Sequence, residues 1–86
     1  MYEVRLLEPA QDNLAKLDKR VAKRVVNKLF WLAENFESVR LEPLQANLAG
    51  FYKLRVGDYR AVYEVVDDEQ VLIVHRVGHR RDVYKL

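Results

Sequence analysis

The sequence predicts an α+β domain in which a hairpin of two helices packs on one face of an antiparallel sheet. Two observations support this prediction. Apolar residues in the first half of the chain recur at the spacing of a helix, and those in the second half alternate with polar residues as in strands. Because 86 residues supply only one modest core, we expect a single domain that spans residues 1–86.

The first half predicts a strand followed by two helices. Residues 2–7 (YEVRLL) indicate a short strand, and Pro9 suits the first turn of a helix, where no backbone N–H is needed. Asp18 is placed to cap a second, longer helix that ends near Asn35. The apolar face of this helix comprises Val21, Val25, Leu29, Leu32 and Phe36, and its basic residues lie mainly off that face: Lys19, Arg20, Lys23, Arg24 and Lys28.

The second half predicts a sheet. Residues 37–50 indicate mostly a connecting loop, with room for a short turn of helix. Three runs rich in β-branched and aromatic residues follow, FYKLRV, YRAVYEVV and QVLIVHRV, separated by Gly57-Asp58 and by the acidic residues 67–69. We expect these runs to form an antiparallel meander. Gly78, like Gly57, is predicted to be a turn residue.

The register of the first predicted hairpin would bring three cations onto one sheet face. With a two-residue turn, Arg55 lies directly opposite Arg60, and Lys53 points to the same side. The other face is apolar and would pack against the helices: Tyr52, Leu54, Val56, Tyr59, Ala61, Tyr63 and Val65. Two directly opposed arginines repel each other unless a negative group lies between them, so the pair indicates an anion-binding site. A slip of one residue in register would remove it.

The charge distribution also points to an anionic partner. Net charge is only +2, but positive charge is concentrated in residues 16–28, 51–60 and 75–86, while residues 61–74 are acidic. Separate positive segments suit a polyanion, because each phosphate contact releases counterions. The alternative is an ordinary mixture of solvated charges.

The residue types exclude several kinds of chemistry. The chain has no cysteine, which excludes disulfides, thiolate catalysis and cysteine-based metal sites. Its histidines, His75 and His79, have no nearby carboxylate cluster, so we expect no metal and no other cofactor. We find no signal peptide and no apolar run long enough to span a bilayer, so we expect a cytoplasmic protein without a membrane partner. Arginines, lysines and tyrosines remain, a set suited to phosphate chemistry.

Two segments, GFYKLRVGDYRAVYEV and VLIVHRVGHRRDVY, resemble the signature stretches of the RelE/ParE toxin superfamily, and the resemblance extends over nearly the whole chain. It implies the toxin of a type II toxin–antitoxin system: a ribosome-dependent endoribonuclease that cuts mRNA in the A site by attack of a ribose 2′-hydroxyl. Two alternatives stay open. One is a ParE-like poison of DNA gyrase without nuclease activity, and the other is a degenerate toxin that only binds its antitoxin.

The resemblance to the RNA-cutting members also implies site residues. Their motif positions correspond here to Lys53, Arg55, Arg60, Arg80 and Tyr84, with Arg81 as an adjacent candidate for RNA binding. Lys53 or Tyr84 would take the proton of the 2′-hydroxyl. Arg55 and Arg60 would hold the phosphate, and Arg80 would neutralise the leaving 5′-oxygen.

The expected partners are nucleic acid and an antitoxin. The basic face of the second helix, Lys23 and Arg24 above all, would bind ribosomal RNA or dock an acidic antitoxin helix. The resemblance implies the ribosome and mRNA as targets. It also implies a cognate RelB-like antitoxin, through which the toxin–antitoxin complex binds operator DNA.

Several candidates also have a purely structural explanation. Arg60 would form an ion pair with Glu64 or Asp58, because a charge among apolar strand residues is costly unless it is paired. Tyr84 would pack in the core or at its edge. Trp31 would be a core residue or a partner contact.

Overall fold

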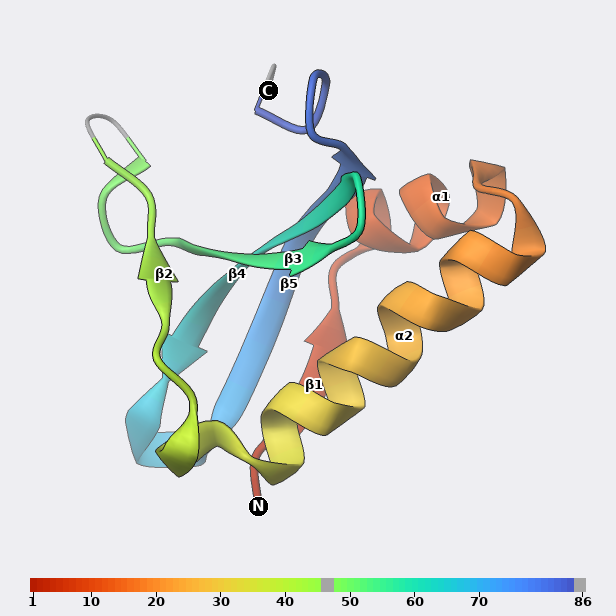
Figure 1. Cartoon of the computed structure of the whole chain (residues 1–86). Helices are drawn as coiled ribbons and strands as arrows, with labels where there is room; N and C mark the ends of the chain where they lie inside the picture. The colour runs from red at the N-terminus through yellow and green to blue at the C-terminus, as the bar shows by residue number, and fades with distance from the viewer. Residues whose placement is uncertain (46–47, 85–86) are drawn as a thin grey trace.

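The computed structural model describes residues 1–45 and 48–84 and shows an α+β fold (Figure 1). Helices α1 (Glu8–Lys16) and α2 (Lys19–Glu34) lie together on one side of a sheet. In the described residues the sheet has five strands in the order β1-β5-β4-β3-β2. These strands are β1 (Glu3–Leu6), β2 (Glu42–Pro43), β3 (Tyr52–Val56), β4 (Tyr59–Val66) and β5 (Val71–His79). The predicted fold class is therefore confirmed.

Local signals determine where the two helices begin. Pro9 lies in the first turn of α1, as predicted. The carboxylate of Asp18 accepts a hydrogen bond from the backbone N–H of Arg20 at 2.9 Å, so it caps α2. The predicted apolar stripe of α2 is fully buried at its centre, at Val25, Leu29 and Leu32. Burial of this stripe holds α2 against the sheet.

Strands β3, β4 and β5 form the predicted antiparallel meander, whereas β1 pairs with β5 in parallel. The sequence predicted a strand at residues 2–7, which β1 confirms, but it did not predict the parallel pairing of β1 with β5. Because β5 is paired on both sides, its apolar run is buried: Val71, Leu72, Val74 and Val77. The pairing of β4 with β5 shifts between Val62 and Tyr63, so that His75 is an extra residue in β5. This β-bulge lies next to the candidate site described below.

One local prediction was incomplete. The segment predicted as mostly loop, residues 37–50, also contains the short strand β2. In this strand Glu42 pairs with Lys53 of β3. A strand of two residues is too short to show an alternating pattern, and Pro43 is compatible with the edge of a sheet. A 3₁₀ turn, Phe36–Ser38, precedes it.

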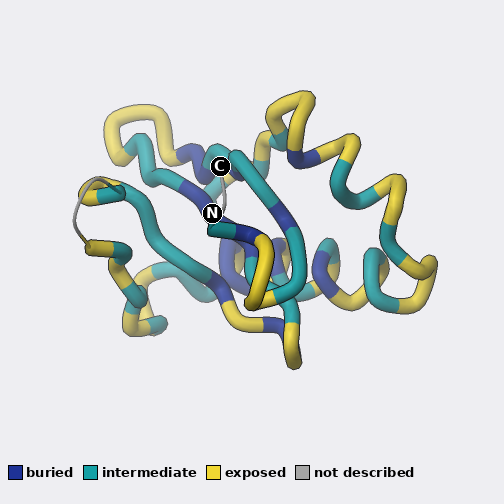
Figure 2. The backbone as a smooth tube through the Cα atoms, turned by 90° about the horizontal axis from the view of Figure 1, so that it is seen from above, coloured by how far each residue is buried: buried dark blue, intermediate teal, exposed yellow. Residues whose placement is uncertain are grey.

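The core lies between the helices and one face of the sheet. Figure 2 shows exposed positions mainly on turns and outer helix surfaces, with buried positions toward the middle. All seven side chains predicted to face inward from β3 and β4 belong to this core or pack against it. Neither described helix is both long and apolar enough to cross a membrane. Among the core residues, Tyr63 is 1% exposed, and this burial raises the pKa of its phenol to about 12.

Tyr63 should make the fold sensitive to alkaline pH. Its pKa rises from 10.0 to about 12 on folding, so the fold favours the neutral phenol. The stabilising effect is intact below pH 10.0 and is lost as the pH rises toward 12. We expect urea unfolding to show a loss of roughly 2–3 kcal/mol over this range, and Tyr63→Phe to remove most of that loss. An equal loss in both proteins would contradict this assignment.

Candidate functional site

Three cations share the sheet face that points away from the helices, which we call the outer face. Arg55 of β3 is the direct partner of Arg60 of β4, and Lys53 is the partner of Val62. The predicted register is therefore confirmed. Directly opposed residues point to the same side of a sheet, so the three cations lie close together.

Arg60 is oriented by backbone oxygens. Its Nη1 donates to two carbonyls at the β3–β4 turn, each at 2.8 Å, and the residue is half-buried. The structural explanation by an ion pair with Glu64 or Asp58 is wrong, because these carboxylates contact other residues. Glu64 contacts His75 at 2.7 Å, and a carboxylate oxygen of Asp58 lies 4.0 Å from Nε of Arg80. In the described residues, no ion pair within 4.0 Å joins Arg60 to either carboxylate.

Arg55 is oriented from the edge of the sheet. Its Nε lies 3.0 Å from Oε2 of Glu42 in β2. This contact places negative charge beside one of the two opposed arginines and so reduces their repulsion. Because both side chains are largely in solvent, the pair contributes little to stability. We infer that its main effect is on the direction of the guanidinium.

The chain returns toward the outer face after β5. Gly78 was predicted to be a turn residue, but it lies within β5, directly opposite Arg60. The side chain of Val83 lies over Gly78, 3.6 Å from the position that a Cβ would take there. The backbone N–H of Arg80 donates to the carbonyl of Asp58 at 2.8 Å. These contacts bring the residues after β5 next to Arg60 and to the β3–β4 turn.

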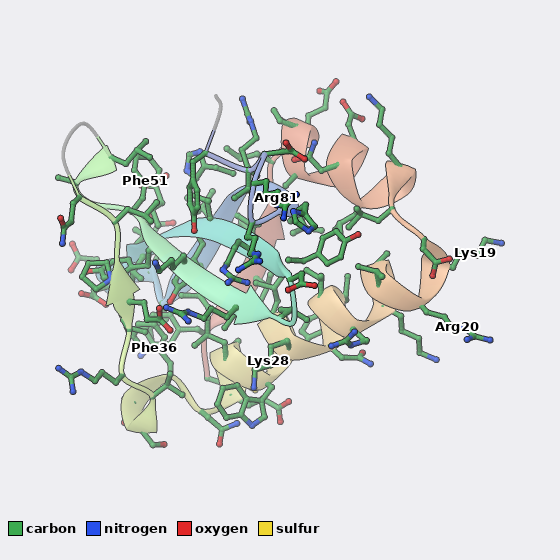
Figure 3. The ribbon with its side chains drawn as sticks, turned by 45° about the horizontal axis from the view of Figure 1, so that its top comes forward. Lys19, Arg20, Lys28, Phe36, Phe51 and Arg81 are labelled. Carbon is green, nitrogen blue, oxygen red and sulfur yellow. The ribbon has the colours of Figure 1, made fainter. Side chains whose placement is uncertain are left out.

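The candidate residues of this C-terminal segment differ in exposure. Arg80 and Arg81 are exposed, and Figure 3 shows Arg81 on the segment that follows β5. The backbone N–H of Arg81 donates to Nδ1 of His79 at 3.2 Å. The hydroxyl of Tyr84 is buried and has no hydrogen-bond partner among the described residues. The structure thus presents the two arginines, whereas the Tyr84 hydroxyl is not open to a substrate. Lys85 lies outside the described residues.

A hollow connects the outer face with α2. It measures about 500 Å³ and is lined by Arg24, Lys28 and Trp31 of α2 and by Arg55 of β3, among others. Trp31 is not a core residue, because it is 42% exposed. Nζ of Lys28 lies 3.8 Å from the centre of its ring, a cation–π contact. Arg55 therefore lies on the outer face beside Arg60 and also lines the hollow with Arg24 and Lys28.

The remaining cations of α2 lie outside this hollow. Lys19 and Arg20 point away from the molecule at the N-terminal end of the helix (Figure 3). Lys23 is exposed and does not line the hollow, in contrast to Arg24. The basic face predicted for this helix therefore extends from open solvent into the hollow.

Known proteins resemble this chain over nearly its whole length. The family model described as the ParE toxin of type II toxin–antitoxin systems matches residues 4–84. The chain belongs to the RelE/ParE superfamily of type II toxins. It is 35% identical to Toxin RelG of Mycobacterium tuberculosis over 85 residues, which are 98% of this chain and 97% of RelG.

Solved toxin structures share the fold of this RelE/ParE toxin. A toxin–antitoxin complex, RelBE2 of Mycobacterium tuberculosis, matches with a TM-score of 0.82 and 35% identity, covering 92% of this chain and 98% of that chain. The isolated Escherichia coli RelE toxin matches with a TM-score of 0.75 and 26% identity, covering 92% of this chain and 84% of RelE. The helical hairpin and its mixed sheet are therefore the fold of RelE toxins.

Sequence reasoning missed part of this toxin's outer face. Nε2 of His75 lies 2.7 Å from Oε1 of Glu64, and Arg76 follows His75 in the bulged part of β5. Only strand pairing brings Glu64 and His75 together, and the bulge could not be read from the sequence. Within residues 1–45 and 48–84, no three His, Cys, Asp or Glu side chains are grouped as a metal site would require.

The β3–β4 turn should tolerate a side chain at Gly57 poorly. Gly57 has a φ of +60°, and an added Cβ would lie 3.2 Å from Nη2 of Arg24. We expect Gly57→Ala to lower the free energy of unfolding by about 1–2 kcal/mol in urea titrations. Gly78→Ala is the matched control, because its Cβ would make only ordinary contacts, from 3.6 Å outward, and should change stability far less. Equal losses in both variants would rule out strain at this turn.

Proposed function

We propose that this toxin is a metal-independent endoribonuclease that cuts mRNA in the A site of the ribosome. One observation supports the proposal above the others. The β3–β4 register gathers Lys53, Arg55 and Arg60 on the outer face, beside the returning segment that carries Arg80. Several fixed cations on one open surface suit the developing charge of a phosphoryl transition state.

The proposed reaction needs only groups of the protein and the RNA. The amine of Lys53 takes the proton of a ribose 2′-hydroxyl, whose oxygen attacks the adjacent phosphorus. Arg60 and Arg55 hold the non-bridging oxygens as charge develops on them. The bond to the 5′-oxygen breaks, and the charge of Arg80 stabilises this leaving group until solvent returns to it the proton that Lys53 removed. A 2′,3′-cyclic phosphate remains. Tyr84 is the alternative base, but its hydroxyl would first have to become exposed. DNA lacks the 2′-hydroxyl and should not be cut.

We further propose that a RelB-like antitoxin controls this activity in the cytoplasm and links the complex to operator DNA. The similar structures include toxin–antitoxin complexes. One is RelBE2 of Mycobacterium tuberculosis, and another is the intact Escherichia coli RelBE complex, with a TM-score of 0.72 and 26% identity over 92% of this chain and 96% of that chain. Exposed basic residues on α2, among them Lys23 and Arg24, suit either an acidic antitoxin segment or ribosomal RNA.

Cleavage should be tested by primer extension on a defined message in a purified translation system. We expect the toxin to cut within A-site codons, and Arg60→Ala or Arg80→Ala to lower the cleavage rate at least ~100-fold, in line with the loss of a group that stabilises transition-state charge. Arg5→Ala is the matched control, since Arg5 lies in β1 at the far edge of the sheet. Cleavage that persists in both site variants would contradict these roles.

The second candidate function is a ParE-like poison of DNA gyrase. The observation that favours it is the matching family model, which is named for the ParE toxin. The primer-extension experiment, followed by a gyrase supercoiling assay, separates the two functions. Intact message and normal translation, together with inhibited gyrase supercoiling, would replace the nuclease by the gyrase poison.

The basic residues of α2 offer a separate test of how the toxin reaches its substrate. Under the ribosome-binding explanation, Lys23→Glu together with Arg24→Glu should weaken ribosome association at least ~10-fold in sedimentation at low salt, because each lost phosphate contact reduces counterion release. The charge-matched control is Lys19→Glu together with Arg20→Glu, at the outward-pointing end of the same helix. Unchanged sedimentation of the first variant would assign Lys23 and Arg24 to the antitoxin instead.

A further inference from the structure

The outer face contains a small hollow beside its cations. It measures about 90 Å³ and is lined by Leu48, Phe51, Val62, His75 and Arg76. Val62 forms an apolar floor, since it is only 1% exposed although it lies on the outer face. The lining of the hollow is thus mostly apolar and aromatic, which suits contact with the flat ring of a base.

Two rings form one wall of this hollow. Phe51 and His75 pack perpendicular to each other, with ring centroids 4.8 Å apart. Perpendicular packing engages the face of one ring only, so the other ring faces stay outside the contact. His75 cannot turn freely, because its Nε2 lies 2.7 Å from Oε1 of Glu64. An aromatic surface is therefore fixed in place and half-exposed.

Cations flank the hollow on both sides. Val62 pairs with Lys53 of β3 on one side and with Arg76 of β5 on the other. Nη1 of Arg76 donates to the carbonyl of His75 at 2.9 Å, which holds its guanidinium at the rim. Fixed rings between phosphate-binding cations are the arrangement by which proteins bind single-stranded nucleic acid.

We propose that this hollow is a nucleobase-binding subsite: a base of single-stranded RNA stacks on the ring face of Phe51, with the perpendicular ring of His75 at its edge, while Lys53 and Arg76 bind the phosphates beside it. Glu64 is a positioning residue that fixes the His75 ring. The subsite rests on the proposed nuclease function for its biological role, because it would hold the nucleotide next to the scissile phosphate at Arg60. Stacking accepts any base, so the subsite adds affinity with little sequence preference.

Methyl and aromatic NMR titrations of the intact toxin test this subsite directly. The probes are 5′-AMP and ribose 5-phosphate, which differ only in the base. We expect 5′-AMP to shift the signals of Leu48, Val62 and Phe51 and to bind roughly tenfold tighter than ribose 5-phosphate, the contribution of one base stack. Equal affinities, or unshifted signals in the hollow, would overturn the proposal.

Substitution of the ring supplies a matched comparison. Phe51→Leu retains apolar volume but removes the stacking surface, and should abolish most of the preference for 5′-AMP. Phe30→Leu is the control, because Phe30 is an exposed ring on α2. Unchanged core methyl signals of Leu29 and Leu32 would show that each variant is folded. A preference for 5′-AMP that survives Phe51→Leu would exclude stacking on this ring.

The subsite and the nuclease function fail in different experiments. If the toxin cuts no message but binds 5′-AMP preferentially, the base subsite stands and the proposed nuclease function is overturned. If the toxin cuts messages but the signals of the hollow do not respond to 5′-AMP, the nuclease function stands and the subsite is overturned.

Discussion

Gly57 adopts a φ of +60°, and the register of the β3–β4 hairpin follows from the tight turn that this conformation permits. A two-residue turn with positive φ at its first position matches the twist of the two strands. The same register places Arg55 opposite Arg60 on one face and the apolar partners on the other. Atoms at the turn then orient the site, because its carbonyls bind Arg60 and the backbone of Arg80.

A face that gathers cations is unfavourable unless the rest of the fold offsets their repulsion. Here the opposite face of the same strands provides the compensation. Its apolar side chains are buried against α1 and α2, and burial of this kind is the main stabilising contribution in a small domain. On the outer face, Glu42 and backbone carbonyls orient the guanidinium groups at little gain in stability. The outer face can therefore be specialised for an anion while the inner face maintains the fold.

Positive side chains lie on both layers of the molecule. They extend from Arg24 and Lys28 beside the hollow to Arg55, then over the outer face to Arg76. A polyanion that follows this path would contact the helix, the paired arginines and the flanked aromatic hollow in turn. Under the proposed function, cations on both layers would let a small domain bind the ribosome and the message together.

The sequence by itself determined the two helices, the three-stranded meander and the face shared by Lys53, Arg55 and Arg60. Each of these features depends on local signals: the Asp18 cap, the periodicity of apolar residues and a two-residue turn. The family resemblance suggested the roles of the cations, and strand pairing placed three of them together.

Tertiary structure alone decided the position of β1, the short edge strand with Glu42 and the bulge that brings His75 to Glu64. These features arise from pairing between separate segments of the chain. The periodic pattern within a segment does not show which other segment it will pair with. Gly78 illustrates the limit: a glycine suggested a turn, but here it lies within β5, directly opposite Arg60, where even an added Cβ would make only ordinary contacts. Only the pairing of strands shows that Gly57 lies at a turn with positive φ whereas Gly78 lies inside a strand.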